Sequence, residues 1–248
     1  AFHPVYSDPA NDFIGHSMAA AGDLNDDGAV DVVTGSHSNL IVVLLLRQGG
    51  SLLSATVLDS SSPSMPFMRP DARCGIGMGL LGRLDGDRYN EVLLGCDHDA
   101  QPTCGVHTLF LGHGGAVVAH ASNWCDEAPL AGVVSTDSSA GKALTGLGDI
   151  DGDGVIDAAY AAEYDTLSAS EGGTVLIGFL LPNGTLRSVV ALSKSSGGSV
   201  INDHLAAFTT GWRLGASIAG VGDLDQDGIP DVVVGSPEAG SPANSGRV

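Results

Sequence analysis

The sequence predicts an all-β fold, and three observations lead to that prediction. Hydrophobic residues make up 43% of the 248 residues, enough for a core, whereas aromatic residues make up only 5% and glycines number 36. This mixture is typical of short strands joined by tight turns rather than of long helices. Short β-type runs recur along the chain and are separated by turn residues. In addition, one acidic pattern recurs four times.

The four copies of this pattern align without gaps, and their starts lie 60, 66 and 74 residues apart. They read GDLNDDGAVDVVTGS, GRLDGDRYNEVLLGC, GDIDGDGVIDAAYAA and GDLDQDGIPDVVVGS, beginning at Gly22, Gly82, Gly148 and Gly222. Seven residues before each start stands a further glycine: Gly15, Gly75, Gly141 and Gly215. The segment between the two glycines is small and apolar, which predicts a buried strand before each acidic loop.

Each unit is expected to contain about four antiparallel strands, because further β-type runs follow the acidic loop. Four strands per unit of 60 to 74 residues is the pattern of a propeller blade. Solenoid repeats are the alternative, but they usually run about 20 to 50 residues and are more uniform. We therefore predict one β-propeller domain over residues 1–248, with blades at about 11–60, 70–125, 136–195 and 205–248.

The fourth blade is predicted to be incomplete, because the sequence stops where its third strand is expected to begin. We expect residues 1–10 to supply a closing strand, either within one chain or from a neighbouring copy. Exchange between successive copies would make a head-to-tail contact that propagates as a tandem array or filament.

The acidic loops of units one, three and four carry oxygen-bearing side chains at loop positions 1, 3, 5 and 9 and a glycine at position 6. With a backbone carbonyl at position 7, five or six oxygens converge on one point, which suits Ca²⁺ better than the stricter octahedron of Mg²⁺. We predict about three calcium ions per chain. The predicted ligands are Asp23, Asn25, Asp27, Ala29 and Asp31; Asp149, Asp151, Asp153, Val155 and Asp157; and Asp223, Asp225, Asp227, Ile229 and Asp231.

Two other interpretations of these loops fit less well. An EF-hand needs a glutamate at position 12 and flanking helices, but Thr34, Tyr160 and Val234 stand there, inside β-type runs. Plain polar turns would not recur in one register between similar strands. Moreover, fifteen of the 29 acidic residues lie in the four loops, and such crowding is costly unless a cation lies among the carboxylates.

Unit two departs from the pattern, with Arg83 at position 1 and Arg88 in place of the turn glycine. Asp85, Asp87 and Glu91 remain. We predict that this loop binds no calcium, and we expect the Arg83 guanidinium to bridge the remaining carboxylates instead.

All four cysteines lie in unit two, and none belongs to a C-x-x-C pair that would indicate a zinc or redox site. We expect two disulfides formed in an oxidising compartment. The favoured pairing joins Cys96 to Cys104 across a short loop and Cys74 to Cys125, with the other two connectivities open.

The repeated pattern resembles the FG-GAP repeat of integrin alpha chains. The likeness extends over all four units: a glycine, a small-residue strand, G-D-x-[DN]-x-D-G-x-x-D, a valine-rich strand and G-[SA]. It is strong in units one and four, good in unit three and degraded in unit two, and the phenylalanine of the family's opening Phe-Gly is absent throughout. The resemblance implies a β-propeller with structural Ca²⁺ in the loops that join the first two strands of a blade. It also implies extracellular recognition or adhesion.

Charge, hydropathy and motifs narrow the function further. A net charge of −19 argues against nucleic acid as a partner, and the longest apolar run, residues 40–46, is too short to cross a membrane. Because no G-x-S-x-G, H-E-x-x-H or P-loop pattern is present, and because the histidines of unit two are interpreted as scattered loop residues, we predict no enzyme.

We therefore expect an extracellular or cell-surface structural or adhesive module that binds protein or glycan ligands, or further copies of itself. A polysaccharide-acting hydrolase or lyase on the same scaffold is the alternative, since paired acids could serve it. Asn183 begins an N-glycosylation sequon at a predicted hairpin tip.

Overall fold

The computed structural model describes residues 14–69, 72–97, 104–135, 138–166, 172–193 and 212–237. Within these ranges every named element is a β-strand except one 3-10 turn, η1 (His113–Gly115). The strands form three sheets of four and one sheet of two, all antiparallel, and no sheet closes on itself. The predicted all-β propeller fold is confirmed.

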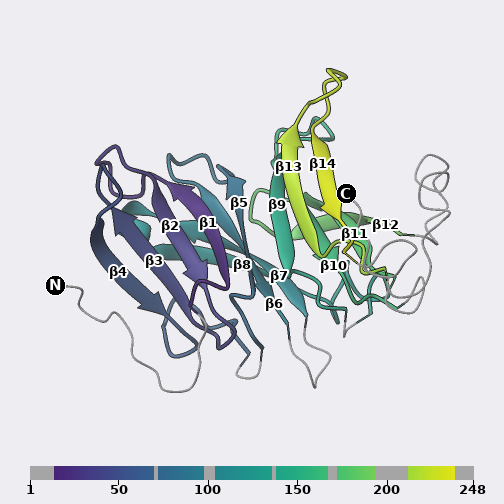
Figure 1. Ribbon diagram of the computed structural model, residues 1–248, viewed down its shortest axis with the longest axis horizontal. Coiled ribbons are helices and arrows are strands. Elements are labelled where there is room, and N and C mark those ends of the chain that lie inside the picture. Colours follow the sequence, from purple (N-terminus) through teal and green to yellow (C-terminus); the bar gives the residue numbers. More distant parts are fainter. Residues whose placement is uncertain are drawn as a thin grey trace.

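Each sheet is one blade, and its strands follow in chain order from the inner to the outer edge (Figure 1). Blade 1 contains β1 (Ser17–Gly22), β2 (Asp31–Gly35), β3 (Ile41–Leu46) and β4 (Leu52–Leu58). Blade 2 contains β5 (Gly77–Gly82), β6 (Glu91–Cys96), β7 (Gly105–Leu111) and β8 (Val117–Trp124). Blade 3 contains β9 (Ala143–Gly148), β10 (Asp157–Ala162), β11 (Thr174–Leu180) and β12 (Leu186–Leu192). Blade 4 contains β13 (Ser217–Gly222) and β14 (Asp231–Gly235).

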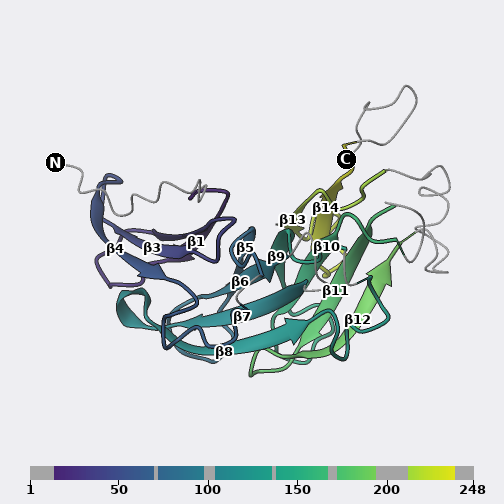
Figure 2. The same ribbon diagram turned by 90° about the horizontal axis from the view of Figure 1, so that it is seen from below.

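The four blades form an arc, with blade 1 and blade 4 at its two ends (Figure 2). The inner strands contact one another in order, β1 with β5, β5 with β9, and β9 with β13. Together they border an axial cavity of about 350 Å³. The predicted closing segment, residues 1–10, and the end of the chain beyond Pro237 lie outside the described residues.

The inner strands are rich in small residues because neighbouring blades approach closely at the axis. A Cβ added to Gly79 on β5 would lie 2.7 Å from the carbonyl oxygen of Leu144 on β9. Farther from the axis, larger side chains fill the space between blades. Val33 and Val43 of blade 1 pack with Val92 and Leu109 of blade 2, and a second cluster joins blades 2 and 3. The hydrophobic core therefore lies between the sheets.

Two disulfides cross-link blade 2, but the pairing favoured from the sequence is wrong. Cys74 bonds to Cys96, and Cys104 bonds to Cys125. The antiparallel register explains the difference, because β5 pairs with β6 and β7 pairs with β8. Cys74 precedes β5 and Cys96 ends β6, so their Cα atoms lie 3.9 Å apart. In the same way the Cys125 N–H donates to the Cys104 carbonyl at the end of the β7–β8 pair, at 2.8 Å.

The core between blades 1 and 2 contains a buried histidine, His107 on β7. Its ring lies 4.9 Å from the ring of Phe67 and 4.5 Å from that of Trp124. Neither ring nitrogen has a hydrogen-bond partner among the described residues. Burial lowers the pKa of His107 to about 3, and the charges of His120 and Arg69 add to this effect. The folded protein therefore holds this imidazole neutral.

We expect this histidine to make the fold sensitive to acid. The unfolded chain binds a proton at His107 below about pH 6.5 whereas the folded chain does not, so stability falls by about 1.4 kcal/mol per pH unit as the pH drops from 6.5 toward 3. Urea unfolding of His107→Leu at about pH 7.5 and about pH 5 should show a pH dependence weaker by about 2 kcal/mol. His113→Gln, at an exposed site, is the control and should behave as the unmodified protein. An unaltered pH dependence in His107→Leu would contradict the prediction.

Candidate metal centres

The acidic loops join the first two strands of each blade, and we number them with the blades: loop 1 (23–31), loop 2 (83–91), loop 3 (149–157) and loop 4 (223–231). In loop 3 the Asp149 carboxylate accepts hydrogen bonds from the N–H groups of Asp153, at 3.1 Å, and Gly154, at 2.8 Å. Asp23 and Asp223 accept the equivalent two bonds in loops 1 and 4. The three loops therefore curl in the same way around the position 1 carboxylate, and these donors, the Gly28 N–H foremost, lower the pKa of Asp23.

Two residues of each such loop adopt left-handed backbone conformations. The glycine at position 6 has φ of 82° in loop 1, 88° in loop 3 and 91° in loop 4. Position 4 is also left-handed, with φ of 62° at Asp26, 78° at Gly152 and 65° at Gln226. The sequence predicted only the glycine at position 6. It did not indicate the left-handed conformation at position 4, because Asp26 and Gln226 stand there in loops 1 and 4 instead of glycine. Loop 2 has Gly86 at position 4 but Arg88 at position 6, so its second half differs.

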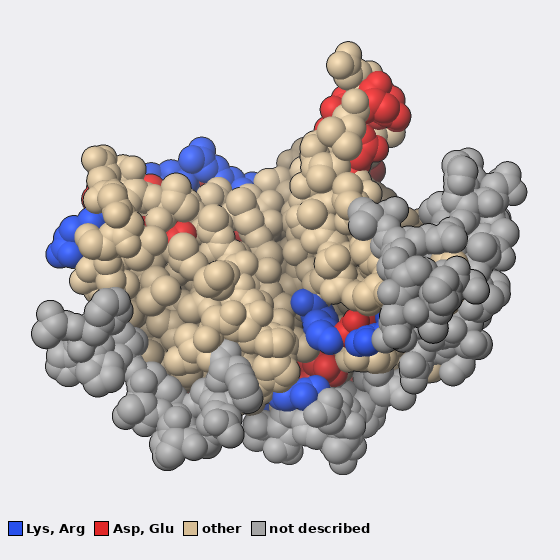
Figure 3. Space-filling model, viewed as in Figure 1, with Lys and Arg blue, Asp and Glu red and all other residues tan. Residues whose placement is uncertain are grey.

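The curled loops gather oxygen ligands. In loop 3, one carboxylate oxygen from each of Asp149, Asp151 and Asp157 lies within 4.8 Å of the others, and the same holds for Asp223, Asp225 and Asp231 in loop 4. Loop 1 has Asn25 at position 3, whose amide bonds to Asp27. Acidic atoms gather close to the projecting tip of the β13–β14 hairpin (Figure 3). An all-oxygen donor set of this kind fits a hard cation such as Ca²⁺.

The position 9 carboxylate has a second role that the sequence did not reveal. Asp31 is fully buried and accepts hydrogen bonds from the Leu24 N–H, at 2.8 Å, and the Leu46 N–H, at 2.7 Å. Asp157 accepts the same pair from Ile150 and Leu180, each at 3.1 Å. One residue thus ties the loop, the second strand and the end of the third strand together. Burial raises the pKa of Asp157, and the two N–H donors oppose this effect.

In loop 2, one carboxylate oxygen from each of Asp85, Asp87 and Glu91, at positions 3, 5 and 9, lies within 4.8 Å of the others, whereas the groups in loops 3 and 4 use positions 1, 3 and 9. Glu91 is fully buried, and Leu84 N–H donates to its Oε2 at 2.6 Å while its Oε1 has no partner among the described residues. Burial, with the charges of Asp85 and Asp87, raises the pKa of Glu91 to about 7. That this loop binds no calcium stays a prediction.

The expected bridge from Arg83 is wrong, since none of the ion pairs between described residues joins Arg83 to Asp85, Asp87 or Glu91. The loop's own backbone N–H groups bind these carboxylates instead, as from Tyr89 to Asp87 at 2.6 Å.

Arginines outside the predicted ligand set contact two of the loops. Arg187 on β12 forms ion pairs with Asp151 and Asp153 in loop 3, so its guanidinium balances carboxylates that a cation would also bind. Arg88 in loop 2 lies 3.1 Å from Asp26 in loop 1, which links two blades. No sequence motif predicted the contacts of Arg187 or Arg88.

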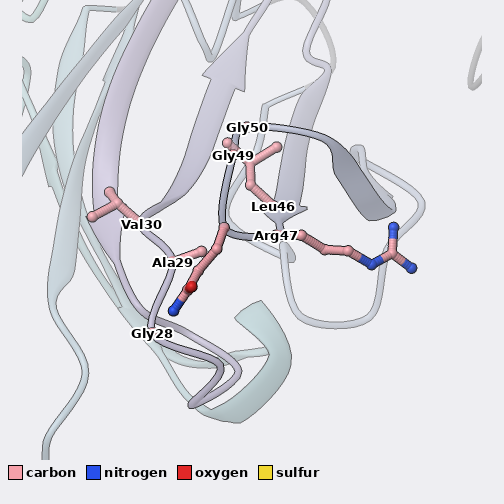
Figure 4. Close-up of a pocket in the computed structure, with 8 residues that line it drawn as sticks. Gly28, Ala29, Val30, Leu46, Arg47, Gly49 and Gly50 are labelled. Carbon is pink, nitrogen blue, oxygen red and sulfur yellow. The ribbon is translucent and has the colours of Figure 1, made fainter.

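A shallow cleft of about 330 Å³ lies between loop 1 and the β3–β4 turn (Figure 4). Ala29, Val30, Leu46 and the Gly49–Gly50 turn line it, and the Arg47 side chain extends away from it. Its lining includes no carboxylate. The Asn183 sequon is exposed at the β11–β12 turn, where Asn183 Oδ1 accepts from Thr185 N–H at 3.1 Å. Its glycosylation stays a prediction.

The FG-GAP repeat model matches residues 214–248, which contain loop 4 and its two strands. The fourth unit is an FG-GAP repeat. A second comparison finds human integrin alpha-IIb, which is 36% identical over 100 residues. That alignment covers 39% of this chain and only 8% of the integrin chain. Together the two matches support the resemblance to FG-GAP repeats of integrin alpha chains that the sequence pattern indicated. In the described part of the chain, no helix has the length and hydropathy of a membrane span.

Replacing the position 9 residue should destabilise the fold with or without metal. Asp31→Ala removes the acceptor of two backbone N–H groups, one of them in a buried bond, which should cost about 2–4 kcal/mol of unfolding free energy even in EGTA. Asp27→Ala is the matched control. Its carboxylate is exposed in the loop, so its loss should cost less than about 1 kcal/mol in EGTA. Equal losses for both variants in EGTA would contradict the second role of Asp31.

Arg187 should weaken cation binding in loop 3. Arg187→Gln removes the competing positive charge at an exposed site, so we expect the loop 3 affinity for calcium to rise about fivefold. Calorimetric titration measures this change. Arg47→Gln serves as the control, because the Arg47 guanidinium bonds to the Leu52 carbonyl and not to a carboxylate. A similar rise in both variants would indicate a general charge effect and refute the specific competition.

Proposed function

We propose that this chain is a calcium-stabilised adhesion module that acts outside the cell and binds a protein or glycan ligand. The observation that carries the proposal is the repetition of one oxygen-lined loop in blades 1, 3 and 4 with the same internal hydrogen bonds. A loop that gathers carboxylates in this way repels itself unless a cation neutralises it. Calcium bound there would stiffen the turn between the first two strands of three blades.

Other features also support an adhesion module that acts outside the cell. Two disulfides within blade 2 are typical of proteins that fold in an oxidising compartment. The similarity to human integrin alpha-IIb supports an adhesive role, because FG-GAP blades present loops from a rigid scaffold. We propose that Asp23, Asn25, Asp27, Asp31 and the corresponding residues of loops 3 and 4 hold about three calcium ions, with carbonyls of Ala29, Val155 and Ile229 as further ligands.

Calcium removal tests the proposal directly. Metal analysis of the purified chain should find about three calcium ions, and EGTA should lower the thermal midpoint by roughly 10 °C, since an ion that binds only the folded state stabilises it. The triple variant Asp23→Ala, Asp149→Ala and Asp223→Ala should bind little calcium and be insensitive to EGTA. A chain that holds no calcium and melts identically in EGTA would refute the calcium role.

A further inference from the structure

Loop 1 contacts blade 2 through a side chain that is not among the predicted calcium ligands. Asp26 stands at position 4 of the loop, between the predicted ligands Asn25 and Asp27. Its Oδ2 lies 3.4 Å from Nδ1 of His113 in η1 and accepts a hydrogen bond from the Tyr89 hydroxyl, also at 3.4 Å. The same hydroxyl lies 3.1 Å from His113 Nδ1. One polar atom from each of three side chains therefore meets the other two where blades 1 and 2 adjoin.

These three atoms, Asp26 Oδ2, Tyr89 Oη and His113 Nδ1, have the spacing of metal ligands. A tetrahedral zinc ion with oxygen and nitrogen ligands at about 2.0–2.1 Å separates those ligands by about 3.3–3.4 Å. The separations in this structure are 3.1, 3.4 and 3.4 Å. A metal ion can therefore contact all three atoms with little movement of the side chains, and a water molecule would complete its coordination.

The surrounding structure holds the three side chains in place. Tyr89 is only 8% exposed and belongs to the core between blades 1 and 2. The Gly114 N–H donates to the Leu24 carbonyl of loop 1 at 2.6 Å, which attaches η1 to the loop directly beside His113. Asp26 lies in the curled part of the same loop, with a left-handed φ of 62°. Because the ligand atoms are already positioned, an ion would bind at a small cost in conformational entropy.

The other oxygen of the Asp26 carboxylate has a separate partner. Nη1 of Arg88 lies 3.1 Å from Asp26 Oδ1, and the guanidinium lies 5.3 Å from the centre of the Tyr89 ring. A partner on the second oxygen fixes the orientation of a ligating carboxylate and leaves Oδ2 for the ion. The positive charge of Arg88 also opposes a bound cation, so we expect micromolar rather than nanomolar affinity.

The repeats do not require this arrangement. It uses a carboxylate at loop position 4 of one blade and a ligand side chain at position 7 of the next. Position 4 is Gly86 in loop 2 and Gly152 in loop 3, and position 7 is Val155 in loop 3 and Ile229 in loop 4. Among the described blades, only the junction of blades 1 and 2 therefore carries these side chains. Packing of one blade on the next does not explain why they meet here.

We propose that Asp26, Tyr89 and His113 bind a divalent transition-metal ion of the zinc type, which connects blade 1 to blade 2. The imidazole nitrogen decides the class of ion, because Ca²⁺ takes oxygen ligands whereas Zn²⁺ accepts nitrogen and oxygen together. The site lies beside loop 1 but uses none of the predicted calcium ligands. It goes beyond the proposed adhesive function, and either proposal can fail without the other.

Calorimetric titration with Zn²⁺ in a large excess of calcium tests the proposal, because calcium then occupies the acidic loops. The unmodified chain should bind zinc. Tyr89→Phe removes one ligand oxygen and keeps the ring in the core, Asp26→Asn keeps the shape and the tolerance of a left-handed φ, and His113→Gln changes an exposed residue. Each variant should weaken the tightest zinc binding about tenfold or more.

His37→Gln is the matched control, because it removes an imidazole from a different polar contact, the one between His37 Nε2 and His16 Nδ1 at 3.1 Å. This variant should bind zinc as the unmodified chain does. Co²⁺ provides a second measurement, since the visible absorption of a tetrahedral ion should appear in His37→Gln and be lost in His113→Gln. No zinc binding by the unmodified chain at about 100 µM, unchanged affinity in His113→Gln, or loss of the absorption in His37→Gln instead would overturn the proposal.

Discussion

The fold depends on a buried carboxylate at position 9 of the acidic loops in blades 1, 2 and 3. In blades 1 and 3 this side chain accepts a hydrogen bond from the start of the loop and another from the end of the third strand. A buried charge is tolerated only when hydrogen bonds or counter-charges replace its water, and here the backbone supplies the hydrogen bonds. The loop is therefore held in a curled shape by the blade itself. A cation would add its own stabilisation to a loop that is already formed.

Blade 2 shows what happens when part of this arrangement changes. Glu91 reaches the same loop N–H as its aspartate counterparts, but its second oxygen has no partner among the described residues, and its pKa rises accordingly. The same blade carries both disulfides, and Arg88 links it to Asp26 of the preceding loop. Both disulfides therefore lie in the blade whose loop departs most from the metal-binding pattern.

The sequence predicted the fold well because the repeats encode it locally. Glycine spacing, the valine-rich second strands and the loop register each recur, so four units could be aligned without structural information. The sequence failed where a contact joins residues far apart. Cysteine spacing could not reveal that strand register brings Cys74 to Cys96, and nothing in the strand containing Arg187 indicated its contact with loop 3. The hydrogen bonds from backbone N–H groups to Asp31 could not be predicted for a different reason. An aspartate serves equally well as a metal ligand and as an acceptor for backbone N–H groups, so the residue type does not distinguish the two roles.

The central claim is that the blade, through its position 9 carboxylate, shapes each loop before any metal binds. Amide hydrogen exchange with calcium and with EGTA tests this claim most directly. We predict that the Leu24, Leu46 and Leu180 amides, which donate to Asp31 and Asp157, stay protected in EGTA, whereas the exposed Gly28 and Gly154 amides exchange faster once the metal is removed. Loss of protection at Leu46 and Leu180 on calcium removal, with the chain still folded, would contradict the account, because the metal and not the buried carboxylate would then hold the loop.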